Sequence, residues 1–191
     1  MVPGLRDELL AMRDEDLRVR EALAETGELF QGYAPAMEAV HRRNAERLRA
    51  LIAAHGWPGR AAAGDDGAEA AWLVAQHAIG EPAFLRAALA ALEDAAARGD
   101  VPAWQPAMLD DRIRMYEGRP QRYGTQLMPD AEGWLRPYHI EDPGGVEARR
   151  AEVGLRPLAE HVAAAGRQEI DDHARFDREY HEWLRRAGWR A

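Results

Sequence analysis

The sequence predicts a mainly α-helical protein, a single-domain helical bundle over residues 1–191 with one irregular excursion at about residues 118–142. Three observations lead to this prediction. Apolar residues recur at helical spacing through most of the chain, glycine and proline separate these stretches, and the excursion mixes glycine, proline and aromatic residues without helical spacing. We expect one domain because no linker long enough to separate two domains interrupts the 191 residues.

The first helix is expected at residues 3–26, with Pro3 in its first turn and Gly27 at its end. Its apolar stripe consists of Leu5, Leu9, Met12, Val19 and Leu23. A second helix is expected from about Pro35 to His55, before a Gly-Trp-Pro-Gly sequence that ends it. Its stripe carries one amide among apolar side chains: Met37, Val40, Asn44, Leu48, Leu51 and Ile52.

Residues 61–67 are expected to form a loop that caps the next helix through Asp65 or Asp66. That third helix, roughly residues 68–79, is apolar on all sides near its end, which predicts that it is buried on all sides. Two further helices are expected at about 82–98 and 102–117.

The excursion is expected to contain a short β-hairpin turning around Pro129-Asp130, with strands within 123–128 and 133–140. Pro137 confines its strand to an edge, because proline has no N–H to donate to a neighbouring strand. Helices are expected again at about 146–153, 157–165 and 168–187.

The residue types that are missing exclude several kinds of chemistry. The chain has no Cys, Ser or Lys, so all 25 cationic side chains are Arg. A Ser or Cys nucleophile, a Lys Schiff base, a P-loop ending in Gly-Lys-Ser/Thr, a Cys-ligated metal and a disulfide all lack an essential residue. His, Asp, Glu, Tyr, Thr and Arg remain as chemical groups.

Charge and hydropathy argue against two classes of partner, nucleic acids and membranes. A net charge of −8, with Arg interspersed among Asp and Glu, argues against nucleic-acid binding. No apolar run approaches the ~20 residues that span a bilayer, and residues 1–8 do not look like the start of a signal peptide. We therefore expect a cytoplasmic protein without membrane contact, and the Ala- and Arg-rich composition is typical of a GC-rich bacterial genome.

The first candidate site is the pair Gln76 and His77 in the apolar third helix. A buried polar side chain without a partner loses on the order of 1–3 kcal/mol, so this pair predicts other polar groups nearby. The alternative is a core histidine satisfied by a backbone carbonyl. Asn44 stands one turn from His41, where Leu would pack better, and is expected to hydrogen-bond a buried group or a ligand.

Two further candidates lie in and beside the excursion. Asp111 and Arg112 are interpreted as part of a solvated helix face, with a buried anchor for the excursion as the alternative. The second is a polar cluster around a glycine, in a chain with few hydroxyl groups. The alternative interpretation of this cluster is a tight turn with incidental polar groups. The members of the cluster are Gln121, Tyr123, Thr125 and Gln126.

No metal and no cofactor are predicted. His173, Asp177 and His181 lie four residues apart, but three such residues span about 12 Å along a helix, too far for one ion. A solvated or partner-facing helix is the favoured interpretation of this segment. His139, beside Glu141 and Asp142, is a weaker ligand or acid–base candidate.

Taken in order, these motifs resemble a bacterial family known only as a domain of unknown function. The resemblance covers roughly residues 40–160 and leaves helices 3–26 and 168–187 as additions; where the family usually has an acidic residue, this chain has Ile79. It supplies no activity, but implies that the polar residues around His77, Asp111 and Thr125 belong together. Its motifs are Gly56-Trp57-Pro58, Trp72, Gln76-His77-Ala78, Asp111-Arg112, Gly118, Gln121, Tyr123-Gly124-Thr125-Gln126, Ile140-Glu141-Asp142, Arg149-Arg150 and Gly154-Leu155.

The favoured function is a small-molecule enzyme that uses acid–base chemistry on a polar or anionic substrate. Histidine suits proton transfer near neutral pH, so His77 is the expected proton-transfer group, with Asp111 orienting it or an Arg. Tyr123 is a second acid, or polarises a carbonyl together with Thr125 and Gln126. Hydrolysis, elimination, cyclisation and isomerisation all remain open.

Substrate binding is expected from polar side chains around these groups. Arg is suited to hold a carboxylate or phosphate. The competing hypothesis is a non-catalytic ligand- or protein-binding module, with a buried polar network and a homo-oligomer or protein partner bound through the C-terminal helix. The expected substrate-binding residues are Gln76, Arg112, Gln121, Thr125, Gln126, Arg149 and Asn44.

Overall fold

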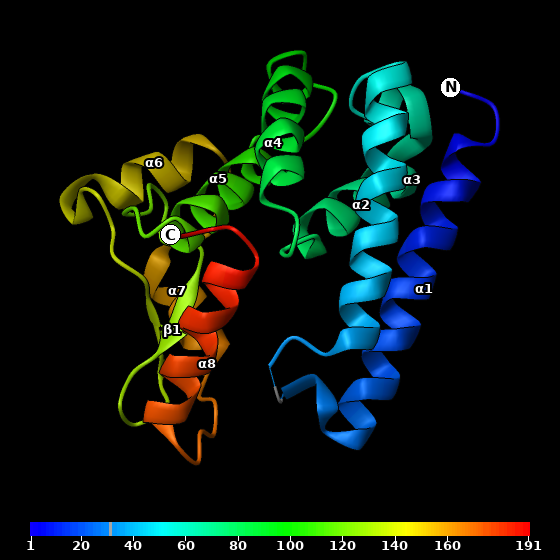
Figure 1. The fold of residues 1–191 in the computed structure, drawn as a ribbon. Helices are drawn as coiled ribbons and strands as arrows, with labels where there is room; N and C mark the ends of the chain where they lie inside the picture. The colour runs from blue at the N-terminus through cyan, green and yellow to red at the C-terminus, as the bar shows by residue number, and fades with distance from the viewer. Residues whose placement is uncertain (31) are drawn as a thin grey trace. The chain divides into compact units, whose positions relative to one another are not determined.

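The computed structural model describes residues 1–30 and 32–191, and its chain divides into two compact units, Met1–Val101 and Pro102–Ala191. Figure 1 shows that both units are built mainly from helices, and that a short pair of strands belongs to the second. The predicted mainly α-helical class with a short hairpin is therefore confirmed. That both units belong to one folding domain stays a prediction.

The first unit is a group of helices in which α1 packs most extensively against α3. Helix α2 contacts α1, α3 and α4. Helix α2 has the predicted bounds, because Pro35 sits in its first turn and Gly56 follows its last residue. The elements of this unit are α1 (Leu5–Thr26), the 3-10 turn η1 (Glu28–Phe30), α2 (Pro35–His55), α3 (Arg60–His77) and α4 (Pro82–Ala97).

The expected loop at 61–67 is wrong, because α3 already begins at Arg60. A carboxylate oxygen of Asp100 accepts a hydrogen bond from the Ala61 N–H at 2.7 Å, which satisfies a donor at the start of the helix. Gly64 has a φ of 74°, a conformation that suits glycine, and its non-helical backbone divides α3 into two helical parts joined by a kink. The helix ends at His77.

Small residues on α3 let α1 approach closely. Gly67 and Ala71 are buried and lie four residues apart, so they share one face of the helix after its kink, and Ala63 is buried just before the kink. A Cβ atom at Gly67 would lie only 3.4 Å from the Arg6 Cα atom of α1. This close approach brings the polar side chains of α1 and α3 within reach of each other.

The second unit is built around the predicted excursion. Strands β1 and β2 pair antiparallel, with Met128 opposite Arg136. Asp130 fixes the turn between them, because its carboxylate accepts a hydrogen bond from the Trp134 N–H at 2.8 Å. The hairpin is shorter than expected. The elements are α5 (Trp104–Tyr116), β1 (Leu127–Pro129), β2 (Leu135–Pro137), η2 (Pro143–Gly145), α6 (Val146–Glu152), α7 (Leu158–Ala165) and α8 (His173–Arg186).

Helix α8 joins the second unit through aromatic side chains. Trp183 meets the ring of Tyr116 edge to face, with ring centroids 5.3 Å apart, and Trp189 lies 5.1 Å from the same ring. The helix is shorter than the expected 168–187, because the Asp172 carboxylate accepts a hydrogen bond from the Arg175 N–H and caps it at His173.

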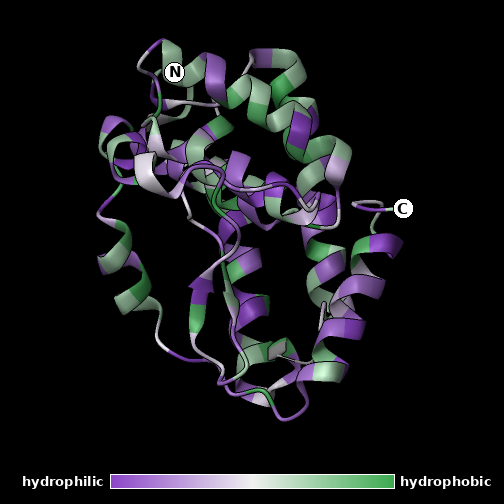
Figure 2. Cartoon of the chain, turned by 90° about the vertical axis from the view of Figure 1, so that its left-hand side faces the viewer, coloured by the Kyte–Doolittle hydropathy of each residue, from purple (hydrophilic) through white to green (hydrophobic). Residues whose placement is uncertain are grey.

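Polar and apolar stretches alternate along the helices (Figure 2). Within the part of the chain that the structure describes, no helix combines the length and apolarity that crossing a membrane requires.

We predict that Ala71→Leu lowers the free energy of unfolding by about 1–3 kcal/mol, because the larger side chain has no space on the fully buried face of α3. Ala61→Leu, at an exposed position of the same helix, is the control and should change stability by less than about 0.5 kcal/mol. Urea unfolding of the two variants measures both values. Equal stabilities would contradict the close contact of α1 with α3.

Candidate functional site

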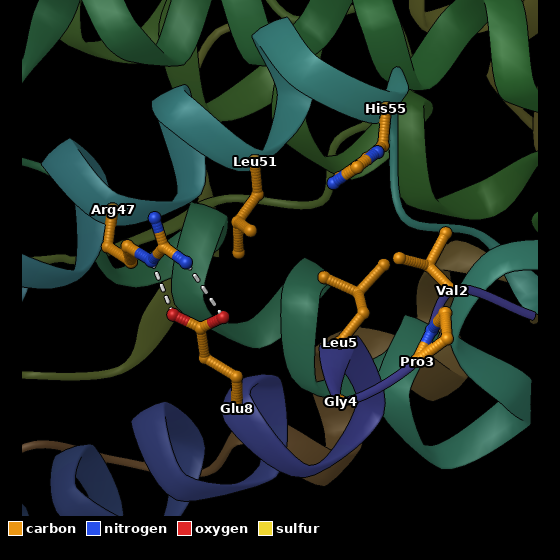
Figure 3. A pocket seen from close by; sticks show the side chains of 8 residues that line it. All are labelled: Val2, Pro3, Gly4, Leu5, Glu8, Arg47, Leu51 and His55. Atoms are coloured by element: carbon orange, nitrogen blue, oxygen red, sulfur yellow. Dashed lines mark hydrogen bonds and ion pairs between the residues drawn. The ribbon is translucent and has the colours of Figure 1, made fainter.

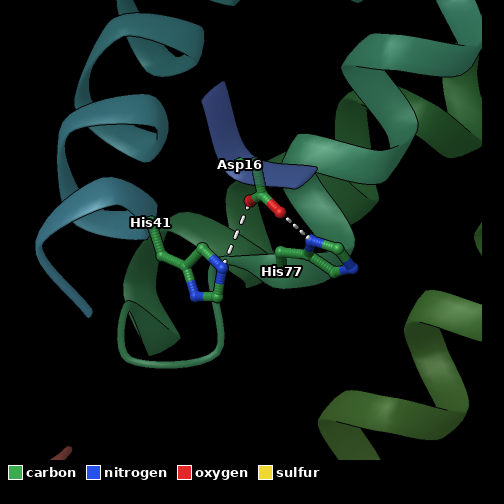
Figure 4. Close-up of side chains that lie close together, drawn as sticks. All are labelled: Asp16, His41 and His77. Carbon is green, nitrogen blue, oxygen red and sulfur yellow. Dashed lines mark hydrogen bonds and ion pairs between the residues drawn. The ribbon is translucent and has the colours of Figure 1, made fainter. Parts of the chain in front are cut away.

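Three polar side chains meet in the first unit, one from each of helices α1, α2 and α3 (Figure 4). His77 Nδ1 lies 2.8 Å from Asp16 Oδ1, and His41 Nε2 lies 3.2 Å from Asp16 Oδ2. The two imidazole rings have their centroids 5.5 Å apart. Asp16 therefore stands between two histidines and presents one oxygen atom to each.

Asp16 carries a buried negative charge. Its side chain is only 1% exposed. Burial alone would raise the pKa of this carboxyl, but the N–H groups of His41 and His77 outweigh burial and lower the pKa to about 2. Asp16 is therefore an ionised acceptor at neutral pH, and the proton that it shares with His77 resides on the imidazole nitrogen Nδ1.

Tyr33 orients the second histidine. Its hydroxyl lies 2.8 Å from His41 Nδ1, and its ring stacks on the imidazole with centroids 5.7 Å apart. In a neutral His41 ring, the proton lies on Nε2, because this nitrogen faces the Asp16 carboxylate. Nδ1 then accepts a hydrogen bond from the Tyr33 hydroxyl. The rotation of the His41 ring is thus fixed from both sides.

His77 is the more accessible of the two histidines. It is the last residue of α3, and its side chain is 23% exposed, whereas that of His41 is 6% exposed. With Nδ1 donating to Asp16, a neutral His77 ring keeps a lone pair on Nε2. This arrangement, a histidine oriented by a buried carboxylate, can accept and return a proton.

The structure gives the other predicted residues of this unit different places. Asn44 is buried and its amide donates to the Met12 carbonyl at 3.2 Å, so it ties α2 to α1. Gln76 is buried in α3 beside His77. The sequence analysis missed Asp16 and named His41 only as a neighbour of Asn44. The usable signal was that Asp16 interrupts the apolar stripe of α1.

A separate surface pocket lies where the start of α1 meets the end of α2 (Figure 3). Its polar wall is the ion pair of Glu8 with Arg47, in which Arg47 Nη2 donates to Glu8 Oε2 at 2.9 Å. None of the predicted site residues lines this pocket.

In the second unit, the expectation that Asp111 lies on a solvated helix face is wrong, because its side chain is fully buried. Its carboxylate accepts hydrogen bonds from the backbone N–H groups of Arg122, Tyr123 and Thr125 at 2.8–3.2 Å. It also accepts one from the Thr125 hydroxyl at 3.0 Å. Asp111 thus anchors the excursion, as the alternative interpretation held, and Asp16 is the carboxylate that the structure places on His77. Burial raises the pKa of Asp111, and these donors partly offset that effect.

A chain of side-chain hydrogen bonds extends this anchor. Arg112 Nε donates to Gln126 Oε1 at 3.0 Å, and Gln126 Nε2 donates to the Thr125 hydroxyl at 3.1 Å. Gln121 is fully buried, and its amide donates to the carbonyls of Gln126 and Tyr138. Of the predicted residues, the structure therefore brings Asp111, Arg112, Gln121, Thr125 and Gln126 together.

The carbonyl groups of the same turn are held by helices α6 and α7. Arg149 Nε donates to the Arg122 carbonyl at 2.7 Å, and the buried Arg150 donates to the Tyr123 carbonyl at 2.6 Å. His161 Nε2 donates to the Thr125 carbonyl at 3.0 Å. The sequence analysis gave Arg150 and His161 no role.

Tyr123 and Gly124 complete the turn in different ways. Tyr123 is half-buried, which raises the pKa of its phenol. Gly124 has a φ of 66°, and a Cβ atom there would lie 2.8 Å from the Ile140 side chain, so only glycine fits. The turn is therefore fixed by its backbone as well as by its polar side chains.

Histidine and carboxylate groups elsewhere do not converge in this way. Among the residues that the structure describes, Asp16, His41 and His77 form the one group of three whose metal-ligating atoms lie within 4.8 Å of one another. On α8, Asp177 and His181 are both exposed.

Together the fold and the sites define a small, mainly helical protein with a buried Asp–His cluster and a carboxylate-anchored turn. The chain belongs to the Family of unknown function (DUF6624), whose model matches residues 3–167. This match begins at α1, well before the expected residue 40, and so includes Asp16; it ends before α8. No curated protein and no solved structure matches the chain.

We predict that Asp111→Ala destabilises the protein by roughly 3–5 kcal/mol, because it leaves three buried or partly buried backbone N–H groups without their acceptor. The control is Asp110→Ala, which removes a half-buried ion pair with Arg114 and should cost about 1 kcal/mol or less. Chemical denaturation measures both losses. Similar values for the two variants would contradict the anchoring role of Asp111.

We predict that His161 makes the protein less stable in acid. Burial, with smaller effects of Arg150 and Arg156, lowers the pKa of His161 below its ordinary value. The unfolded chain therefore takes up this proton first, so the free energy of unfolding falls as pH drops below about 6.5. His161→Gln keeps an N–H donor without the titration and should flatten this part of the profile. Parallel profiles of the two proteins between about pH 5 and 7 would contradict the prediction.

Proposed function

We propose that the protein is a small-molecule enzyme in which His77, oriented by Asp16, transfers a proton to and from a polar or anionic substrate. The observation that supports this most directly is the 2.8 Å contact between His77 Nδ1 and the buried Asp16 carboxylate. It fixes the tautomer of the ring and turns Nε2 outward on a side chain that solvent reaches. Hydrolysis, elimination, cyclisation and isomerisation all use such a base.

Asp16 is placed to support His77 when the imidazole takes up a proton. When Nε2 takes a proton the ring becomes positive, and a fixed negative charge against Nδ1–H stabilises that state. Because Asp16 is held by both histidines, it needs no rearrangement when the charge appears.

The second unit carries its own set of proposed ligand-binding residues, which are considered separately from His77. Tyr123 is half-buried in the turn at 121–126 and is proposed as an acid for a ligand bound by this unit. Arg112 donates from its Nε atom to Gln126, and its guanidinium is of the kind that is proposed to recognise an anionic group. Arg149 already donates from all three nitrogens to Arg122 and Asp142, which favours a structural role.

The alternative function is a non-catalytic binding module, and one observation favours it. The donors and acceptors of the turn at 121–126 are matched by protein groups on α5, α6 and α7. A network satisfied in this way serves to hold the excursion in a fixed shape for a partner.

We predict that the purified protein depletes specific compounds from a pool of polar metabolites, and that His77→Ala slows this depletion by about 10²–10⁴-fold. Mass spectrometry follows the pool over time, and circular dichroism verifies that the variant is folded. His55→Ala, at an exposed position of α2, is the matched control and should behave as the wild type.

Asp16→Asn and Tyr123→Phe test the proposed roles in each unit by itself. Asp16→Asn should slow the same reaction by about 10²-fold or more, because it removes the charge that supports the protonated ring. Folded His77→Ala and Tyr123→Phe variants with wild-type depletion rates would remove both proposed catalytic roles and leave the binding module.

A further inference from the structure

We propose that Asp16, His41 and His77 bind one divalent transition-metal ion of the Zn²⁺, Co²⁺ or Fe²⁺ class. This inference uses the centre of the proposed function but does not depend on catalysis there. Figure 4 shows the three side chains converging from separate helices. Two imidazoles and one carboxylate form a donor set that such ions favour.

The separations of the ligand atoms fit an ion of this size. With bonds of about 2.0–2.2 Å in a tetrahedral arrangement, ligand atoms lie about 3.4 Å apart. Asp16 lies 2.8 Å from His77 Nδ1 and 3.2 Å from His41 Nε2, and all three ligand atoms lie within 4.8 Å of one another. Side-chain adjustments of about an ångström bring them to coordination distance.

Two of these atoms are buried without a hydrogen bond. Asp16 Oδ2 and His41 Nε2 lie 3.2 Å apart as an ion-pair contact, but this contact lacks the geometry of a hydrogen bond, and neither atom has another partner among the described residues. Both side chains are more than nine-tenths buried, where an unsatisfied polar atom is unfavourable. An ion shared by these two atoms would satisfy both, which a purely structural ion pair at this geometry does not.

The Tyr33 hydroxyl can hydrogen-bond His41 both with and without a metal ion on Nε2. Metal binding at Nε2 moves the ring proton to Nδ1, which then donates to the Tyr33 hydroxyl at 2.8 Å. A hydroxyl both donates and accepts, so this contact is kept with and without the ion. Such a partner of the remote ring nitrogen is a regular feature of histidine metal ligands.

The site leaves room for a further ligand. Asp16 and His41 close its inner side, whereas the half-buried His77 borders solvent. Three protein ligands and an open position are the pattern of catalytic rather than structural zinc sites. Nitrogen donors also select against Mg²⁺ and Ca²⁺, which take oxygen ligands.

The test is titration of the chelator-treated full-length protein with Co²⁺, read by its visible absorption, followed by displacement with Zn²⁺. We expect one ion per chain, an absorption band of the intensity typical of four- or five-coordinate Co²⁺, and no displacement by Mg²⁺. Elemental analysis after gel filtration gives the stoichiometry independently of any enzymatic activity.

Variants connect the binding to the three side chains. His77→Gln changes a partly exposed residue and should abolish the absorption band in a protein that circular dichroism shows to be folded. Tyr33→Phe keeps the ring that packs on Gly80 and removes only the hydroxyl, so we expect a 10- to 100-fold loss of affinity. His55→Gln, at an exposed position of α2, is the matched control and should bind as the wild type.

The outcomes separate this inference from the proposed function. Absence of stoichiometric Co²⁺ and Zn²⁺ binding, or binding that His77→Gln leaves unchanged, overturns the metal site. His77-dependent turnover by the metal-free protein also overturns a requirement for the ion while supporting His77 as the base. Binding that requires His77, in a protein without His77-dependent turnover, supports the metal site and overturns the proposed function.

Discussion

The structure of the first unit depends on pairing one buried negative charge. Asp16 lies where α1, α2 and α3 meet, and an ionised carboxylate there is tolerated only with compensating donors. His77 closes one side and His41 the other, so the charge connects all three helices. The small residues of α3 contribute indirectly, because they let α1 come close enough for the contact between Asp16 and His77 to form. The close packing of α1 against α3 therefore also positions the Asp16–His77 pair.

Helical spacing and helix-ending residues were enough to predict most of the secondary structure. Helix α2 was predicted from Pro35 to His55 because proline and glycine mark both ends. The start of α3 was not predicted, because its cap comes from Asp100, which is distant in sequence. The expected loop at 61–67 reduces to the non-helical kink at Gly64, since the residues on both sides of this glycine are helical. The sequence pattern predicts the ends of a helix well when neighbouring residues cap it, and poorly when the cap comes from a distant part of the chain.

The sequence pattern predicted His77 as a site residue but did not predict Asp16, its partner. A polar residue inside an apolar stripe drew attention to His77 and Asn44, and the same test applies to Asp16, which lies between Met12 and Val19 at helical spacing. Asp16 instead resembled part of the charged run around it. Spacing rules for metal ligands do not detect such a cluster, because they describe ligands on one helix or loop, whereas these three side chains come from three helices. Convergence of that kind is a property of tertiary packing.

The two buried carboxylates differ in what holds them, and this difference favours chemistry at one and structure at the other. Asp111 is surrounded chiefly by backbone N–H groups, which do not titrate, so these donors do not change with pH. Asp16 is held by two imidazoles, whose protons can leave, return or be replaced by a metal ion. A carboxylate with fixed donors rigidifies the turn at 121–126. A carboxylate with exchangeable donors can take part in a reaction, and one of those donors, His77, reaches solvent.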